Sequence, residues 1–137
     1  MTINQSELVS AMKSGTPLAM PVIDIHAHLG DYCAMYTPYA DAQGMVEEMD
    51  AVGVKVAAIS TIAALASDYV AGNDLAAKAA RDFPGRFLGY ASVNPHYGDL
   101  QTGELKRCFD EHGFRLIKIH PGLHVYPLTG KAYECVY

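Results

Sequence analysis

The hydrophobic residues of this 137-residue chain follow two alternating patterns. Short apolar runs, rich in β-branched residues, predict buried strands over residues 22–28, 54–60, 86–93 and 114–119. Apolar residues at helical spacing predict helices over residues 2–14, 41–52, 73–83 and 99–112, and the start of another over 130–137. Strands that alternate with helices form a parallel sheet with right-handed crossovers. The pattern therefore predicts an α/β fold.

Polar residues and glycines mark the expected helix ends. Thr2 opens a sequence that resembles a capping box for the first helix. Asp41 and Asn73 are the expected N-caps of the next two helices, and Gly53 is the expected end of the helix that Asp41 begins. Residues 1–21 thus form a leading helix and a linker into the first strand.

Polar side chains, rather than a glycine-rich loop, follow the predicted strands. No G-x-G-x-x-G or Walker sequence comes after the first strand, so nucleotide binding has little support. The strands end instead at His26 and His28, Ser60 and Thr61, Ser92 and Asn94, and Lys118 and His120. Active sites of (β/α) barrels lie at the carboxyl ends of their strands, which favours a parallel barrel over an open doubly wound sheet.

The length allows only part of such a barrel. A complete (β/α)₈ barrel needs about 250 residues, whereas this chain ends after four predicted strands. We therefore expect residues 1–137 to form a single domain of about four βα units, a partial TIM barrel that corresponds to the N-terminal half.

His26 and His28 are the candidate metal ligands. Residues two apart on a strand project to one face, with Cα atoms about 7 Å apart. Two neutral imidazoles that converge there suit a divalent metal, with zinc as the default for this ligand type. Asp24 has the same parity, so we expect it on that face, orienting a ligand histidine or pairing with Lys118. The alternative is a pair of strand-end histidines with hydrogen-bond partners in the protein.

Lys118 and His120 are the candidate catalytic residues. Both are expected on the inner face of the fourth strand, at the same rim as the candidate metal ligands. His120 could contact substrate, transfer a proton or bind the metal; the alternative is a hydrogen bond to the backbone. We assign His96 and His112 structural roles. A helix that would pair His120 with His124 is not expected, because a proline and a glycine lie between them.

Composition and charge narrow the range of partners. The net charge is −5 and the ten basic residues are scattered, which argues against nucleic acid and anionic membranes. Three distant cysteines without a C-x-x-C pair indicate neither a disulfide framework nor a zinc knuckle. No apolar signal core or bilayer-length apolar run is present. We expect a cytoplasmic protein with reduced thiols whose partner is a small molecule.

Three segments together resemble the amidohydrolase-related family of the amidohydrolase 2 type. They are D-I-H-A-H, ending at His28; R-F-L-G-Y-A-S-V-N-P, ending at Pro95; and I-K-I-H-P, ending at Pro121. The H-x-H pair alone is shared by several hydrolase groups, so the other two segments make the match specific. The resemblance extends from about Val22 to the end of the chain.

The resemblance implies a metal-dependent (β/α)₈ enzyme, with zinc or manganese, that hydrolyses, decarboxylates or hydrates small organic acids. His26 and His28 match the family's metal pair on the first strand, and Lys118 and His120 match its fourth-strand motif. The family's remaining ligands lie on later strands, beyond Tyr137. The chain is thus expected to be the N-terminal part of an enzyme, or a half-barrel that a second copy completes as a homo-oligomer.

Two further interpretations stay open, and with them the question of whether the chain is an enzyme by itself. One is a catalytically inactive fragment or partner-binding half-barrel. The other is a TatD-like or phosphoesterase-type metal hydrolase. The second is disfavoured because those enzymes typically carry an acidic residue where Lys118 and His120 stand here.

Overall fold

The structure is a computed structural model that describes residues 5–18, 20–32, 34 and 36–137. Its sheet contains four strands in the order β1-β2-β3-β4, and each neighbouring pair is parallel. The strands are β1 (Val22–Leu29), β2 (Val54–Thr61), β3 (Phe87–Ser92) and β4 (Leu116–Lys118). The expectation of a partial (β/α) barrel is confirmed, with all four strands found where the apolar runs lie, although β4 is only three residues long.

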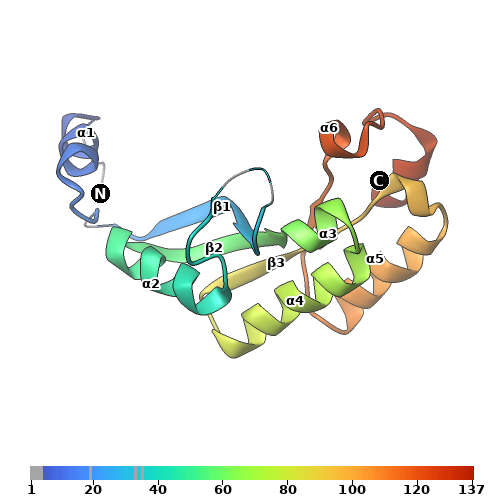
Figure 1. Ribbon diagram of the computed structural model, residues 1–137, viewed down its shortest axis with the longest axis horizontal. Coiled ribbons are helices and arrows are strands. Elements are labelled where there is room, and N and C mark those ends of the chain that lie inside the picture. The colour runs from blue at the N-terminus through green and yellow to red at the C-terminus, as the bar shows by residue number, and fades with distance from the viewer. Residues whose placement is uncertain (1–4, 19, 33, 35) are drawn as a thin grey trace.

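Helices precede, connect and follow the strands, and those that pack on the sheet cover one of its sides. They are α1 (Gln5–Ser14), α2 (Ala42–Val52), α3 (Ile62–Ala66), α4 (Tyr69–Asp82), α5 (Leu100–Asp110) and α6 (Pro121–His124), with short 3₁₀ helices at Pro95–Tyr97 and Lys131–Val136. α2 packs on β2, α4 packs on β2 and β3, and α5 packs on β3 (Figure 1). No helix among the described residues is long and apolar enough to cross a membrane.

The caps of α2 confirm the local sequence signals. Asp41 accepts a hydrogen bond from the Gly44 N–H at 2.8 Å, which satisfies a donor that the first turn leaves free. Gly53 has a φ of 81° and donates its N–H to Met49, a conformation that glycine adopts without steric cost. Thr2, the expected cap of the first helix, lies outside the described residues.

The prediction that Asn73 caps a helix is wrong. α4 begins four residues earlier, at Tyr69, and Asp68 caps it by accepting from the Ala71 N–H. Asn73 lies buried inside α4, where its amide bonds both the N–H and the C=O of Ser92 on β3 and also donates to Glu104. An asparagine with partners on distant elements is well satisfied within a helix.

The end of the chain also differs from the expected pattern. α6 forms directly after His120 in spite of Pro121, because proline fits the first position of a helix, where no N–H is needed. Residues 131–136 form a 3₁₀ helix, whereas the sequence pattern predicts an α-helix there. Short helices such as α3 and α6 carry too few residues for apolar spacing to reveal them.

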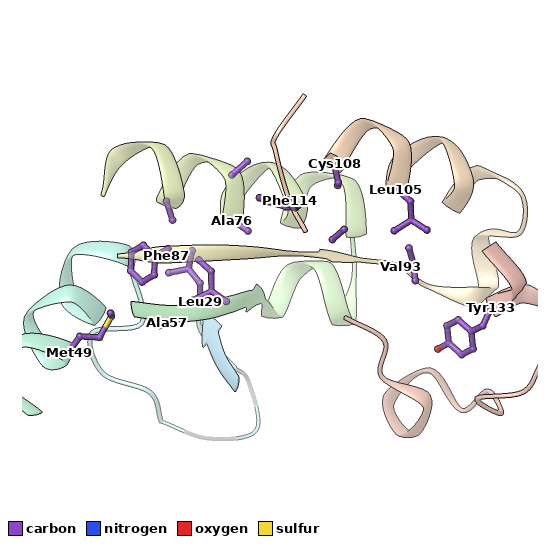
Figure 2. Close-up of a cluster of buried hydrophobic side chains, with 14 residues drawn as sticks. Leu29, Met49, Ala57, Ala76, Phe87, Val93, Leu105, Cys108, Phe114 and Tyr133 are labelled. Atoms are coloured by element: carbon purple, nitrogen blue, oxygen red, sulfur yellow. The ribbon is translucent and has the colours of Figure 1, made fainter. Parts of the chain in front are cut away.

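The hydrophobic core lies between the sheet and the helices that cover it. Figure 2 shows the buried side chains of this cluster, including Phe87 of β3, Val93 just after β3, Ala76 of α4 and Leu105 of α5. Small side chains let the layers approach closely. A Cβ atom on Gly89 of β3 would overlap the buried Phe114 ring.

The opposite face of the sheet is open. Ile23 and Ile25 of β1 are 59% and 71% exposed, and Leu88 of β3 is 50% exposed. Leu88 is paired with Ala58, two residues before Ser60, so it lies on the same face of the sheet as Ser60. No helix among the described residues covers this concave face, which would be the interior of a closed barrel.

The close approach at Gly89 predicts a large cost for a single methyl group. Gly89→Ala is expected to lower the free energy of unfolding by about 1–3 kcal/mol, because the Phe114 ring must move. Gly103→Ala in α5 is the control: nothing lies near its Cβ position, so the change should be stabilising, by about 0.5–1 kcal/mol. Urea unfolding measures both; equal effects would contradict the packing described.

Candidate metal centre

His26 and His28 converge with Lys118 at the carboxyl ends of the strands. The two imidazole rings lie 5.1 Å apart between centroids at an interplanar angle of 66°. The Nζ atom of Lys118, on β4, lies 2.7 Å from Nε2 of His26. This side-chain contact links β1 and β4, which lie at opposite edges of the sheet. The fold thus places both candidate metal ligands beside the candidate catalytic lysine.

His28 is held by the neighbouring strand. It is paired with Ser60 of β2, whose buried hydroxyl lies 3.1 Å from Nδ1 of the imidazole. This contact occupies Nδ1, so Nε2 is the nitrogen that could bind a metal. Burial lowers the pKa of His28, and the nearby Lys118, His26 and His120 lower that pKa further. The neutral form that results is the form that binds a metal.

Lys118 contacts the imidazole of His26, the other candidate metal ligand. An ammonium group can only donate, so Nε2 of His26 is the acceptor and its lone pair points at Nζ. Lys118 is half-buried, and desolvation lowers its pKa. A metal that used this lone pair of His26 would have to displace the lysine from it.

The prediction that Asp24 shares a face with the two histidines is wrong. Asp24 is paired with Ala57 and Ala27 with Ile59, so β1 advances three residues while β2 advances two. This additional residue is a β-bulge, and it places Asp24 and Ala27 on the same side of the sheet. Both line a cavity against Met45 and Met49 of α2.

The expected Asp24–Lys118 ion pair is also absent among the described residues. The carboxylate of Asp24 instead accepts the backbone N–H of His26 at 2.9 Å, and Lys118 contacts the His26 imidazole. The bulge separates the two charged groups, because it turns the carboxylate toward the helix-covered side of the sheet.

His120 is the N-cap of α6. Its Nδ1 atom accepts the N–H of Leu123 at 3.0 Å, so the proton of the neutral ring is on Nε2. His120 lies close enough to His28 to influence its charge. In this arrangement the ring can donate an Nε2–H hydrogen bond, as suits contact with an anionic group.

The described residues would supply only part of a metal site. No group of three or more His, Cys, Asp or Glu side chains that could hold a metal is found within the described ranges. The chemistry of the donor set, two converging imidazoles, fits a divalent transition metal. Protein metal sites usually use at least three ligands, so the two histidines fit as part of a larger set.

Two of the remaining histidines have protein partners, as the sequence interpretation expects. Nε2 of His96 lies 2.6 Å from the carbonyl oxygen of His124. His112 lies beyond the end of α5, not in its last turn as expected, and bonds Asp74 and Arg107. Neither is bonded to His26, His28 or Lys118.

His124 has a structural role that the sequence does not reveal. The ring is buried: Nε2 donates to the carbonyl of Leu65 in α3, and Nδ1 accepts from the hydroxyl of Tyr133, both at 3.0 Å. These two bonds tie the C-terminal segment to α3. Sequence spacing gives no signal for them, because Leu65 lies 59 residues away.

Comparison with known sequences assigns the chain to a family. The sequence model of the amidohydrolase family matches residues 23–137, which include all four strands except Val22, the first residue of β1. The chain belongs to this family, as the three segments of the sequence indicate.

The solved structures with the same fold include two decarboxylases and a hydratase by name, and one of these decarboxylases carries bound manganese. 5-Carboxyvanillate decarboxylase from Novosphingobium aromaticivorans, with bound manganese, aligns with a TM-score of 0.68 at 18% identity over 86% of this chain and 47% of its own. 4-Oxalomesaconate hydratase from Rhodopseudomonas palustris aligns with a TM-score of 0.60 at 20% identity over 85% and 48%. 2,6-Dihydroxybenzoate decarboxylase from Rhizobium aligns with a TM-score of 0.53 at 22% identity over 71% and 37%.

These similarities establish the fold. At such identities the particular activities do not transfer, and the chain spans about half the length, or less, of each of these proteins. The four strands are thus a curled half of the barrel that the neighbours complete.

The burial of His124 predicts an acid-sensitive fold. Burial lowers the pKa of His124 from its ordinary 6.5. Below about pH 6.5 the unfolded chain therefore binds a proton at this ring that the folded chain excludes, and the free energy of unfolding decreases as the pH is lowered. His124→Gln preserves a donor for Leu65 and an acceptor for Tyr133 but does not titrate. Urea unfolding between about pH 7.5 and pH 5.5 should show a shallower decline for this variant than for the wild type.

His96→Gln is the matched control for the acid experiment. It keeps a donor toward the His124 carbonyl and leaves His124 able to titrate. Because the charge of His96 also lowers the pKa of His124, the stability of this variant should decline somewhat less steeply than that of the wild type but more steeply than that of His124→Gln. A His124→Gln variant with the full wild-type decline would show that other groups cause the acid sensitivity.

Proposed function

We propose that this chain is the N-terminal half of a metal-dependent amidohydrolase-type enzyme that acts on a small organic acid or amide by hydrolysis or decarboxylation. The convergence of His26 and His28 with Lys118 at the carboxyl rim carries the proposal. Family membership over residues 23–137 supports it. His26 and His28 would hold the metal, and Lys118 and His120 would contact the substrate.

The metal in this proposal is zinc or manganese. Imidazole ligands favour zinc, whereas the support for manganese is that it is bound in the structure of 5-carboxyvanillate decarboxylase named above. When bound, a divalent metal polarises a carbonyl or activates water. The further ligands would come from the second half of a barrel, supplied by additional polypeptide or by a second copy of this chain.

The polar groups of the rim favour an anionic substrate. Lys118 provides an ammonium group, and the Nε2–H of His120 is available to donate because the helix cap occupies Nδ1. Asp24, which would oppose an anion, is turned to the other face of the sheet. These residues would bind and orient a carboxylate beside the metal, through charge-assisted hydrogen bonds.

A partner-binding half-barrel without catalysis is the second candidate. The exposure of Ile25 and Leu88 on the concave face favours it, since exposed apolar surface commonly marks an interaction site. Metal binding distinguishes the two functions, because a partner-binding role alone needs no metal at the His26–His28 pair.

For the cellular location we propose the cytoplasm, which the free thiols of Cys108 and Cys135 support.

The metal proposal predicts selective loss of binding. The purified chain should bind zinc or manganese in equilibrium dialysis, and His26→Ala or His28→Ala should weaken binding by at least about tenfold, because each removes one of two described ligands. His96→Gln, away from the rim, should bind as the wild type does. Equal binding by the wild type and both alanine variants would place any metal elsewhere; no binding by the wild type would contradict the proposal.

Lys118→Met separates metal binding from anion binding. The ammonium group repels a dication, and two unit charges 4 Å apart near a protein surface repel by about 4 kcal/mol. The variant should therefore bind zinc about tenfold more tightly or better, while its affinity for benzoate, a simple carboxylate probe, should fall. Lys106→Met, an exposed lysine of α5, should change neither. Unchanged benzoate affinity in Lys118→Met would contradict the substrate-binding role; calorimetry measures both ligands.

A further inference from the structure

Both polar groups of one peptide unit in β1 are held by side chains. The peptide between Ile25 and His26 presents its N–H to the carboxylate of Asp24 at 2.9 Å. Its carbonyl oxygen, that of Ile25, accepts the hydroxyl of Tyr90 at 2.7 Å. This peptide lies inside the β-bulge, where the pairing of β1 with β2 passes from Asp24 directly to Ala27.

Tyr90 reaches this peptide from another strand. Tyr90 lies on β3, and β2 lies between β3 and β1. The side chain of Tyr90 therefore extends along the concave face, across β2, to reach β1. Asp24 acts from the residue next to the peptide, with its side chain directed to the helix-covered side. One side chain from each side of the sheet thus fixes the orientation of a single peptide.

The orientation of this peptide determines the direction of the His26 side chain. The peptide ends at the Cα atom of His26, so rotating it would move the Cβ atom and swing the imidazole away from His28 and Lys118. Metal ligands must be held to within about 0.5 Å of their working positions. A bulge is irregular and lacks the regular ladder that would otherwise hold the strand, so the two side-chain bonds take over that role.

We propose that Asp24 and Tyr90 are positioning residues that lock the β1 bulge and thereby aim His26 at the metal position. The inference deepens the proposed function and rests on it where it concerns the metal. It also assigns a role to Asp24 that differs from ligation, orientation of an imidazole nitrogen or pairing with Lys118: its carboxylate holds the backbone. Neither residue touches the metal or the substrate in this scheme.

The first test needs no metal. In the wild type, NMR should detect a nuclear Overhauser effect between the rings of His26 and His28, whose centroids lie 5.1 Å apart. Tyr90→Phe removes one hydroxyl and Asp24→Ala removes the carboxylate; each should weaken or abolish this signal. Asp24→Asn retains an oxygen that can accept the His26 N–H, so it should preserve the signal.

Tyr97→Phe is the matched control. Its hydroxyl also donates to a backbone carbonyl, that of Ser67, but away from the rim, so its removal should leave the ring contact unchanged. Circular dichroism shows whether each variant stays folded. Full wild-type signals in both Tyr90→Phe and Asp24→Ala would overturn the inference, whatever the metal data show.

The second test uses cobalt(II) as a spectroscopic substitute for zinc. Tyr90→Phe and Asp24→Ala should bind cobalt about tenfold more weakly than the wild type, in line with other residues that orient ligands, with a changed visible absorption band. Asp24→Asn and Tyr97→Phe should match the wild type. Wild-type affinity and spectrum in Tyr90→Phe and Asp24→Ala would overturn the inference. If the wild type binds no metal but the ring contact is lost in Tyr90→Phe and Asp24→Ala, the proposed function is contradicted and the positioning role is supported.

Discussion

Parallel pairing of four strands is the constraint on which the rest of this structure depends. Because all four strands run in one direction, their carboxyl ends meet at one rim, and residues from opposite ends of the chain become neighbours. His28 beside Ser60 and Lys118 beside Ser92 are consequences of that register. The contact between Lys118 and His26, 92 residues apart, closes the rim across the sheet.

A buried polar network holds the helices to this sheet. Asn73 of α4 bonds the Ser92 backbone and Glu104 of α5, and Glu104 in turn accepts from the guanidinium of Arg107. The bonds to Glu104 and Asp74 raise the pKa of Arg107, so it stays charged. A buried carboxylate is costly without such partners. The network thus fixes α4 and α5 against β3, which supports the strand that carries Tyr90.

The sequence was enough to predict which residues belong to the candidate site, but not how their side chains are arranged. The spacing of His26 and His28 and the polar residues after each apolar run were enough to indicate the rim. The side of the sheet on which Asp24 lies could not be predicted, because side chains alternate strictly between the two faces only in a regular strand and the bulge adds one residue. The contacts of Tyr90 with Ile25 and of Ser60 with His28 could not be predicted for a related reason. They join different strands, and local spacing carries no information about cross-strand contacts.

The sequence by itself determined the α/β class, the order of the strands, the caps of α2 and membership of the amidohydrolase family. These depend on local apolar periodicity, capping chemistry and short motifs. Only the tertiary structure decided that Asn73 ties α4 to β3 and α5, that His120 caps α6 and that His124 binds α3. It also decided that Asp24 holds the backbone of His26. Each of these depends on contacts between distant elements, and the register of the folded sheet, not the local sequence, brings those elements together.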